Sequence, residues 1–452
     1  MHVRVSRRGR STTAVLAFLV STTLSHAQDA LAPSAPARPD LKVGSFVNGN
    51  DEREALTKDE LIVRFRSEVD PEFLRHVGKV LGFELADRGR NGAFEVLRVP
   101  AELVDVWATW LAAQPEVELV ERNPLCHTTA APNDPLYAPY QWNFLNRGAL
   151  SNGRVSNHGV QAEAAWPTST GSSVVVAIVD TGVAYETYGG FAQAPDLAGR
   201  TFVSPYNAIN GTTHANDDNG HGTHVAGTIG QSTNNGLGVA GLAYGCSIMP
   251  VKVLNSAGSG SHAQIANGIT WAADHGAKVI NLSLGGSTGS TTLSNAITYA
   301  WGRGVVICAA TGNTGRSGVS YPARYTNCIA VGATRFDGNR SGYSTYGTGI
   351  DVVAPGGDTS VDQNGDGYGD GILQQTFATG TPTTFSYYFF QGTSMATPHV
   401  AAIAALVIAH RPTYTNAQVR SAIESSCQDR GSAGYDTRYG NGLVDAAAAL
   451  TR

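Results

Sequence analysis

The chain has 452 residues, a length that exceeds one typical domain and predicts two or three folded units. Charged residues make up only 15% of the sequence, glycine occurs 53 times and the formal net charge is −5. This composition is typical of a globular protein with many tight turns. Because the body of the chain has no basic stripe or Lys/Arg cluster, we expect neither nucleic acid nor an anionic membrane as a partner.

The first 27 residues have the pattern of a secretory signal peptide. Basic residues between positions 4 and 10 precede an apolar run at 15–20, and small side chains at Ser25 and Ala27 suit cleavage after Ala27. A membrane anchor is the alternative, although the apolar run is short, and Arg7-Arg8 leaves twin-arginine export open. No later segment has the length and apolarity of a membrane span. We therefore expect a secreted, extracellular protein that has no membrane span once the signal is removed.

Five cysteines stand at positions 126, 246, 308, 328 and 427, which is an odd number for an exported protein. If Cys126 leaves with an N-terminal segment, four cysteines remain and can pair. We expect one disulfide between Cys308 and Cys328. Buried free thiols are the alternative, because Cys308 lies within the apolar run VVICA.

Residues 28–130 divide into an irregular leader and a small folded domain. The leader, at 28–57, is polar and rich in Ala and Pro, which predicts disorder. From residue 59 to about 123 the apolar pattern predicts the order β-α-β-β-α-β, a split βαβ unit. The strands are expected at 60–65, 83–86, 93–99 and 117–120, and the helices at 71–81 and 101–113.

In residues 131–452, short apolar runs alternate with longer segments of helical periodicity. Strands that are apolar along their whole length are typical of a sheet covered on both faces, so we predict an α/β domain with a doubly wound, mostly parallel sheet. Functional groups in such a sheet gather at the carboxyl ends of strands. The strands are expected at 173–179, 248–253, 277–282, 304–308 and 328–332, and the helices at 222–229, 262–275, 290–303 and 400–409.

Asp180, His221 and Ser394 stand where this architecture places functional groups. Asp180 follows an apolar strand, and His221 and Ser394 each lie at the start of a predicted helix, where free N–H groups stabilise negative charge. Each residue also has a plainer interpretation: a turn aspartate, a metal ligand paired with His224, and an N-cap serine. The metal pair is disfavoured because no Glu occupies the position that zinc peptidases use between the two histidines.

The three residue types together make a nucleophilic triad. A serine hydroxyl is unreactive until a base takes its proton, the base must titrate near neutral pH, and a carboxylate must orient that base. The chain order Asp, His, Ser is that of subtilisin, whereas chymotrypsin and the α/β-hydrolases have other orders.

The sequence around these residues resembles the signature blocks of the subtilisin family, the subtilases. The blocks are VDTG at 179–182, HGTHVAG at 221–227 and GTSMATP at 392–398. The resemblance extends from about Asp134 to the sequence GNGLVD at 440–445. It implies a secreted serine endopeptidase of the subtilisin-like α/β fold, with the three residues as its catalytic triad.

The same resemblance assigns Asn313, within AATGN at 309–313, as the side chain of the oxyanion hole. An amide donor at this position, joined by the backbone N–H of Ser394, can bind the oxyanion of a tetrahedral intermediate.

The resemblance further implies that an extended peptide adds as a β-strand beside the sequence SLGG at 283–286. Pairing between main chains discriminates little among side chains, so we expect broad specificity. The segments expected to wall the primary pocket contain no acidic residue, which favours apolar or aromatic side chains over Lys or Arg. The residues expected to bind substrate are Ser283, Leu284, Gly285, Gly286, Ala310, Thr311, Gly312 and Ser320.

The small domain at 59–123 is similar to the inhibitor-like propeptide of this family, which assists folding and occupies the active site until it is cleaved. We expect the enzyme to cleave itself between about 126 and 131, before the sequence PNDPL at 132–136. The expected partners are therefore protein and peptide substrates and the chain's own propeptide, with the mature enzyme a monomer.

Two segments have the pattern of structural Ca²⁺ sites. The sequence DQNGDGYGD at 362–370, in an insertion at 357–390, alternates oxygen ligands with other residues as an EF-hand loop does, but Leu373 replaces its final Glu. A solvated acidic turn is the alternative. The resemblance implies a second site around NNGLGV at 234–239. The expected ligands are Asp362, Asn364, Asp366 and Asp370 in the insertion, and Asp134, Asp196, Asn235 and the carbonyls of Leu237 and Val239 in the second site.

Two other classes of protein have specific requirements that the sequence does not meet. A binding protein of the same fold without activity is expected to lack a catalytic residue, and none is missing. A nucleotide-binding α/β enzyme needs a Gly-rich phosphate loop after its first strand, and the sequence DTGV at 180–183 has none.

Overall fold

The computed structural model describes residues 43–47, 53–67, 69–89, 92–124, 131–144 and 158–452. The predicted signal peptide at 1–27, Cys126 and most of the predicted processing region lie outside these residues. Contacts divide the chain into two compact units, Met1–Thr128 and Thr129–Arg452, which are described separately.

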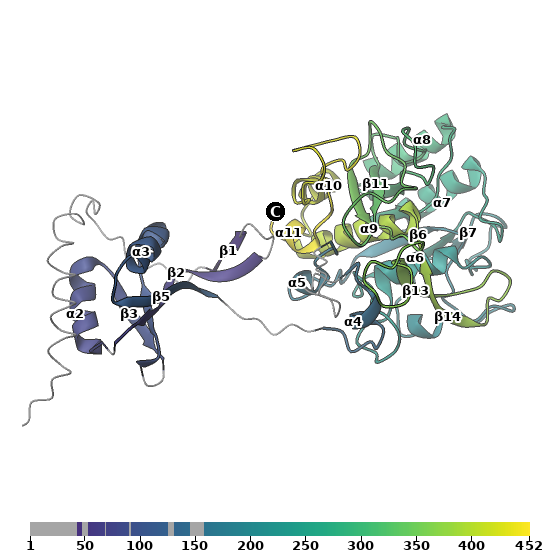
Figure 1. The fold of residues 1–452 in the computed structure, drawn as a ribbon. Helices are drawn as coiled ribbons and strands as arrows, with labels where there is room; N and C mark the ends of the chain where they lie inside the picture. The colour runs from purple at the N-terminus through teal and green to yellow at the C-terminus, as the bar shows by residue number, and fades with distance from the viewer. Residues whose placement is uncertain (1–42, 48–52, 68, 90–91, 125–130, 145–157) are drawn as a thin grey trace, which may run out of the picture. The chain divides into compact units, whose positions relative to one another are not determined.

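The N-terminal unit is an antiparallel sheet with two main helices (Figure 1). Its strands run in the order β1-β2-β4-β3, and β5 also pairs with β2. Leu61, Val63 and Leu97 form its core together with Leu111 of a helix, and all four side chains are buried. The elements are β1 (Val43–Val47), β2 (Arg53–Phe65), α2 (Pro71–Leu81), β3 (Glu84–Arg88), β4 (Glu95–Arg98), the short η2 (Ala101–Leu103), α3 (Val104–Ala112) and β5 (Val117–Pro124).

From β2 to β5 the order of elements is the predicted β-α-β-β-α-β. The helix α2 shows why local sequence is informative here: the side chain of Asp70 accepts a hydrogen bond from Glu72 N, Pro71 opens the first turn, and Gly82 ends the helix with φ +88°. We predicted disorder for the leader at 28–57, but part of it is ordered. Residues 43–47 pair with 53–57 as an antiparallel ladder. Such pairing uses backbone groups and does not require an apolar pattern.

The C-terminal unit contains a seven-stranded parallel sheet between layers of helices (Figure 1). The elements are α4 (Tyr137–Tyr140), α5 (Ala162–Ala165), β6 (Val175–Asp180), η3 (Pro195–Leu197), β7 (Tyr206–Asn207), α6 (His221–Gly230), β8 (Ser247–Lys252), α7 (His262–Asp274), β9 (Val279–Leu282), α8 (Thr291–Gly302), β10 (Val306–Ala310), β11 (Ile329–Thr334), β12 (Val352–Pro355), β13 (Ile372–Phe377), β14 (Phe385–Phe390), α9 (Thr393–His410), α10 (Asn416–Ser425) and α11 (Ala446–Leu450).

The order of the strands, β12-β11-β10-β9-β6-β8-β7, confirms the predicted doubly wound sheet. From β6 the chain continues to β7 and β8 on one side, and then crosses to β9 on the other. The two loops that leave β6 and β9 therefore diverge at a topological switch point, where ligands bind in open α/β sheets.

Both faces of the sheet are covered, which explains why its strands are apolar throughout. Val176 and Ile178 of β6 belong to the cluster that contains α6 and α9, whereas Ala177 and Val179 belong to the cluster that contains α7 and α8. Successive side chains of a strand point to opposite faces. Every position of the apolar run in β6 therefore packs against one of the two helix layers.

Among the described residues, α9 is long and apolar enough to cross a membrane by length and composition, contrary to our expectation that no later segment is. Its mean hydropathy is 1.3, and 78% of it is buried inside the unit. A core helix that packs against several strands needs apolar side chains all round, and α9 contacts β9, β10, β11 and β12.

The predicted disulfide between Cys308 and Cys328 is not formed in the structure, where both thiols are free and buried. In the ladder between β10 and β11, Cys308 pairs with Ile329 rather than with Cys328. Cys308 and Ile329 share one apolar cluster, while Cys328 packs in the cluster on the opposite face. The expectation was wrong because a shift of one residue reverses the face to which a side chain points.

The insertion at 357–390 folds as an irregular loop followed by the antiparallel hairpin β13-β14. The hairpin packs on α6. Nε2 of His224 in that helix lies 3.0 Å from the carbonyl oxygen of Ile372 and 3.1 Å from that of Tyr388, and its ring stacks on Phe390. The insertion is therefore part of the packing around the helix that begins at His221.

The first turn of α6 approaches the turn after β6 closely enough to require a glycine. A Cβ atom at Gly222 is expected 2.1 Å from the carbonyl oxygen of Gly182, a contact with backbone that no side-chain movement relieves. The absence of a side chain at position 222 thus sets how closely His221 lies to Asp180.

We predict that Gly222→Ala lowers the unfolding temperature of the C-terminal unit, because overpacking of this kind costs about 1–3 kcal/mol. Gly302→Ala is the matched control, since a Cβ atom there meets nothing within 4 Å. Calorimetry in a Ser394→Ala background avoids self-digestion. Equal unfolding temperatures for the two variants contradict the prediction.

Candidate active site

Asp180 and His221 are in direct contact. Asp180 is the last residue of β6 and is 0% exposed, and its Oδ1 lies 2.7 Å from Nδ1 of His221, the first residue of α6. Thr181 N also donates to Oδ1 at 2.7 Å. The backbone N–H of the next residue thus fixes the carboxylate of Asp180. The carboxylate in turn orients the imidazole, whose Nδ1–H donates to it.

The surroundings of His221 favour the protonated imidazole. Burial by itself lowers its pKa, but the neighbouring carboxylate of Asp180 and, farther away, that of Asp217 raise the pKa above its usual value. A base that becomes cationic during a reaction is stabilised by such surroundings.

Ser394 stands in the first turn of α9, at the carboxyl edge of the sheet. Its Oγ donates to the carbonyl oxygen of Ser283 at 3.1 Å, and Ser283 Oγ donates to the carbonyl oxygen of Ser394 at 2.7 Å. Ser394 N has no hydrogen-bond partner within the described residues, as is usual at the start of a helix. The residue therefore presents a hydroxyl and a free N–H together.

Asn313 is oriented by the residue that precedes Ser394. Its Oδ1 accepts hydrogen bonds from Thr393 N and Thr393 Oγ1, both at 2.9 Å. A backbone N–H only donates, so the bonded atom must be the amide oxygen and the amide nitrogen Nδ2 points elsewhere. This arrangement leaves Nδ2 as a donor close to Ser394.

A cleft of about 400 Å³ lies beside His221. It is lined by the predicted substrate residues Ser283, Leu284, Gly285 and Gly286, and by Leu254 and the segment 258–260. The structure thus places the predicted binding edge next to the candidate base.

The other predicted substrate residues, 310–312 and Ser320, gather behind Gly285. A Cβ atom at Gly285 is expected 3.4 Å from Ser320 Cβ and 3.8 Å from the carbonyl oxygen of Ala310. Ser320 N donates to the carbonyl oxygen of Thr311 at 3.0 Å, and Gly312, with φ +105°, faces Ser320 Oγ. These segments are adjacent in the structure, and their role as the walls of one pocket stays a prediction.

The contacts of His221 and His224 do not support the alternative that the two side chains hold a metal ion. His221 contacts Asp180, whereas His224 Nε2 faces two carbonyl oxygens of the hairpin and must carry the proton. Burial lowers the pKa of His224 to about 3, which keeps it neutral.

Asp217 is a residue of the site that sequence reasoning missed. It is 0% exposed, and its two oxygens accept five hydrogen bonds, which come from Thr181 Oγ1, Asn219 N, Gly220 N, Thr223 N and Thr223 Oγ1. Its position four residues before His221 was a signal, but an aspartate in a Gly-containing loop reads equally well as a turn residue.

Four of the predicted calcium ligands around 234–239 are connected. Asp134 accepts from Asn235 N at 3.3 Å, Asn235 Nδ2 donates to Asp196 at 2.8 Å, and Val239 N donates to Asp196 at 3.1 Å. Asp134 and Asp196 are 3% and 0% exposed, and no Lys or Arg pairs with either in the described part of the chain. Burial raises the pKa of Asp196 to about 6. Two buried carboxylates without a cationic partner are consistent with a bound cation.

The loop at 362–370 also gathers carboxylates. Asp362 accepts from Gly365 N at 2.6 Å, and Asp366 accepts from Tyr368 N at 2.8 Å and from Asn364 Nδ2 at 2.9 Å. Asp370 is 1% exposed, and its buried Oδ1 has no hydrogen-bond partner among the residues that the structure describes. Burial, with a smaller contribution from Asp362 and Asp366, raises the pKa of Asp370 to about 6. An unpaired oxygen in this environment fits a cation ligand.

Within the described residues, no group of three or more His, Cys, Asp or Glu side chains is placed to hold a metal ion. Any cation at these two places must therefore also use carbonyl and amide oxygens, which Ca²⁺ accepts readily.

Comparisons with known proteins agree with this geometry. The sequence matches the subtilase family over residues 171–442, more than half of the chain. It is 39% identical to thermitase of Thermoactinomyces vulgaris over 319 residues, which cover 71% of this chain and 99% of thermitase. It is 36% identical over 402 residues to the thermophilic serine proteinase of a Bacillus species, which cover 88% of this chain and 89% of that protein.

A solved structure of a protease from Pseudoalteromonas arctica resembles this one with a TM-score of 0.61 and 34% identity, over 71% of this chain and 99% of that chain. The family match, the relatives named as serine proteases and the shared fold lead to one conclusion. The chain belongs to the subtilase family and is a serine-type endopeptidase.

Proposed function

We propose that this endopeptidase cleaves peptide bonds with Asp180, His221, Ser394 and Asn313 as its catalytic residues. The observation that carries the proposal is the 2.7 Å contact between buried Asp180 Oδ1 and His221 Nδ1. It lies at the edge of the sheet where Thr393 joins Asn313 to the start of α9.

Ser394 Oγ attacks the carbonyl carbon of the scissile bond while His221 Nε2 takes its proton. For this step the hydroxyl must leave its acceptor, Ser283 O, by rotation of the serine side chain. Asp180 stabilises the imidazolium that forms. Asn313 Nδ2 and Ser394 N–H donate to the oxyanion. His221 then protonates the leaving amine, and a water molecule repeats the sequence to release the acyl group and regenerate Ser394.

The substrate is an extended segment of a protein, bound along 283–286 on one side and 258–260 on the other. A strand bound through its main chain is selected weakly by side chains, which supports broad specificity. The cleft contains Leu254, Ile265 and Leu293 and no Asp or Glu, and the predicted primary pocket around 310–312 also has no acidic residue. We therefore expect the enzyme to prefer substrates with an apolar or aromatic side chain in the primary pocket.

Residues 28–130 act as a leader and an inhibitory propeptide, and residues 1–27 direct secretion to the extracellular space. The alignment with the thermophilic serine proteinase supports a precursor, because its 402 residues exceed the length of the C-terminal unit and so extend into the N-terminal one. The enzyme removes the propeptide itself and works as a monomer.

Ca²⁺ bound at the two acidic sites stabilises the folded protease. Asp134, Asp196, Asn235 and the carbonyls of Leu237 and Val239 hold one ion, and Asp362, Asn364, Asp366 and Asp370 hold another. Ca²⁺ neutralises the buried carboxylates and so lowers the cost of their burial.

The catalytic proposal predicts that Ser394→Ala abolishes both self-cleavage and casein hydrolysis. The full-length precursor should accumulate on electrophoresis, because no other nucleophile replaces the hydroxyl. Ser386→Ala, on the exposed side of β14, is the control and should mature normally. A Ser394→Ala chain that still matures by itself and digests casein contradicts the proposal.

The oxyanion role predicts that Asn313→Leu lowers kcat by about 10²–10³ with little change in KM, the usual effect of losing one such donor. Steady-state kinetics with a soluble peptide substrate measure both constants. Asn295→Leu, on the exposed face of α8, should leave kcat within about twofold. A similar kcat for the two variants excludes the role.

The calcium proposal predicts that EDTA lowers the unfolding temperature of the Ser394→Ala protein and that added Ca²⁺ restores it, because a ligand at about 100 times its Kd stabilises the native state by about 2.7 kcal/mol. Asp370→Asn should reduce this difference, whereas Asp358→Asn, which changes a carboxylate outside the ligand set, should not. An unfolding temperature that is independent of Ca²⁺ shows that the acidic loops are merely solvated turns.

A further inference from the structure

A buried lysine lies beside the candidate triad and has no part in the mechanism above. Lys252 is the last residue of β8, and its side chain is 6% exposed. It pairs in register with Asp180 of β6, so the two side chains rise on the same face of the sheet. A buried ammonium is costly unless it is paired and fully hydrogen-bonded.

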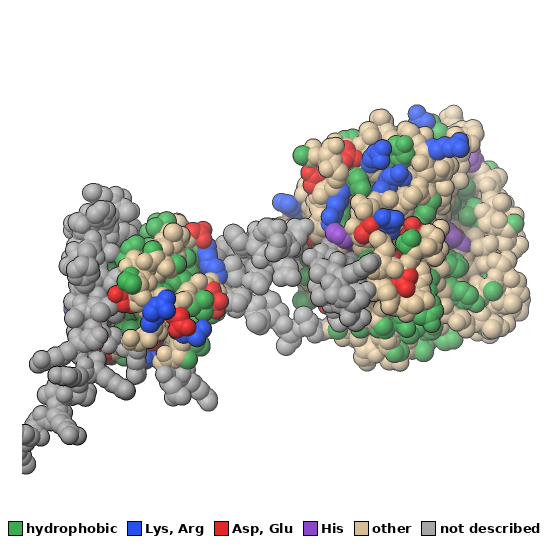
Figure 2. Space-filling view, in the orientation of Figure 1, with side chains coloured by type: hydrophobic (Ala, Val, Ile, Leu, Met, Phe, Trp, Pro, Cys, Tyr) green, Lys and Arg blue, Asp and Glu red, His purple; other side chains and the backbone are tan. Residues whose placement is uncertain are grey.

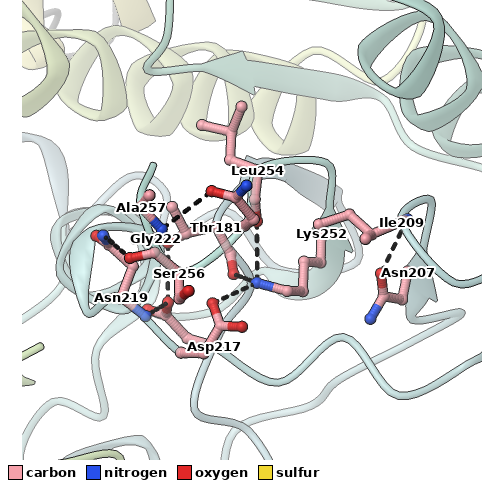
Figure 3. Close-up of polar contacts among 12 residues, drawn as sticks. Thr181, Asn207, Ile209, Asp217, Asn219, Gly222, Lys252, Leu254, Ser256 and Ala257 are labelled. Carbon is pink, nitrogen blue, oxygen red and sulfur yellow. Dashed lines mark hydrogen bonds and ion pairs between the residues drawn. The ribbon is translucent and has the colours of Figure 1, made fainter. Parts of the chain in front are cut away.

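All three N–H groups of the Lys252 ammonium have acceptors, and the acceptors come from three segments (Figure 3). Nζ donates to the carbonyl oxygen of Thr181 at 2.6 Å, to Asp218 Oδ1 at 2.6 Å and to the carbonyl oxygen of Leu254 at 2.9 Å. Thr181 follows Asp180, Asp218 precedes His221 by three residues, and Leu254 opens the loop that lines the cleft. One cation therefore joins the turn after Asp180, the loop before His221 and a wall of the substrate cleft.

Thr181 is the point where these contacts meet the Asp180–His221 pair. Its N–H donates to Asp180 Oδ1, its hydroxyl donates to Asp217 Oδ1 and accepts from Gly222 N, and its carbonyl oxygen accepts from Lys252. A displacement of Thr181 must therefore move both Asp180 and the start of α6. Figure 3 shows Thr181 between Lys252 and Gly222.

We propose that Lys252 is a positioning residue of the active site, whose ammonium fixes the turn after Asp180 against the loop that leads to His221. This inference rests on the triad proposed above. An apolar side chain of similar size can fill the same volume, so a role in packing alone does not need the charge. The positive charge holds two carbonyl dipoles and one carboxylate at a single point, which an apolar side chain cannot do.

We expect charge at position 252 to affect the titration of His221 as well, because Lys252 pairs in register with Asp180, the partner of His221. Asp180 of β6 contacts His221, and Asp217 of the preceding loop and His224 of the same helix interact with it electrostatically. His262 of α7 lines the same cleft, and the ion pair between Lys252 of β8 and Asp218 lies beside Thr181, the residue after Asp180. Removal of the positive charge of Lys252 favours the imidazolium, so the pKa of His221 should rise. Removal of the negative charge of Asp218 should lower it.

The test compares Lys252→Met, Lys252→Arg and Asp218→Asn in the full chain, with the exposed Lys278→Met as control. The pH dependence of kcat/KM is measured on a soluble peptide with an apolar residue before the scissile bond, and the active fraction is counted with a fluorophosphonate. We expect Lys252→Met to lower kcat by about 10- to 100-fold, as small misplacements of catalytic groups do, and to move the acidic limb to higher pH. Asp218→Asn should move this limb to lower pH.

Lys252→Arg keeps the positive charge, but its guanidinium spreads the donors over several nitrogens, whereas the Lys252 ammonium donates to all three acceptors from one. We therefore expect the acidic limb of the pH profile to stay at its wild-type position and kcat to fall in part. Since Asp218 is partly exposed, Asp218→Asn still tests the inference if Lys252→Met fails to fold. The inference is overturned if the variants that fold match Lys278→Met in both kcat and the acidic limb. A wild-type chain that does not cleave the peptide, or a Ser394→Ala chain that cleaves it equally, contradicts the proposed function instead.

Discussion

The structure of the active site depends on how closely the first turn of α6 approaches the carboxyl end of β6. Asp180 and His221 are 41 positions apart in the sequence, yet their side chains are 2.7 Å apart. Gly222 makes this approach possible, because any side chain there meets the carbonyl oxygen of Gly182. Hydrogen bonds of the buried Asp217 carboxylate and of the Lys252 ammonium then fix the loop that precedes His221. A change in any of these contacts displaces His221 relative to Asp180.

The parallel sheet supplies the rest of the arrangement. Because β6 and β9 are parallel neighbours, Asp180 at the end of β6 and Ser283 just after β9 lie at the same edge of the sheet. The start of α9 reaches this edge, and Ser283 and Ser394 exchange two hydrogen bonds there. In the view of Figure 2, Lys and Arg side chains gather on the upper part of the C-terminal unit, with acidic side chains among them.

Much of the fold could be predicted from sequence because its strands and helices are strongly patterned. The apolar runs at 173–179 and 328–332 became β6 and β11, and the doubly wound sheet was confirmed. Asp180, His221 and Ser394 could be proposed as catalytic residues because each stands in a short motif beside a predicted strand or helix. What the sequence did not indicate depends on contacts between distant segments. In the sequence, Lys252 is simply a lysine at the end of a predicted strand. Its three acceptors come from separate segments, so spacing along the chain does not reveal them.

The errors have the same physical origin. The expected Cys308–Cys328 bridge failed because spacing along the chain does not reveal which face of the sheet a side chain joins. The apolarity of α9 was underestimated because its side chains pack in the core on all sides rather than along one stripe. The hairpin β13-β14 was not expected, although it covers α6 and holds His224.

The central claim is that Ser394 is the nucleophile that His221 activates. It is tested most directly by reaction of the mature protein with a fluorophosphonate, followed by peptide mapping in a mass spectrometer. We predict one adduct, on Ser394, and a rate of labelling that falls by orders of magnitude in His221→Ala. An adduct on another residue, or labelling of Ser394 at the same rate without His221, would contradict this claim.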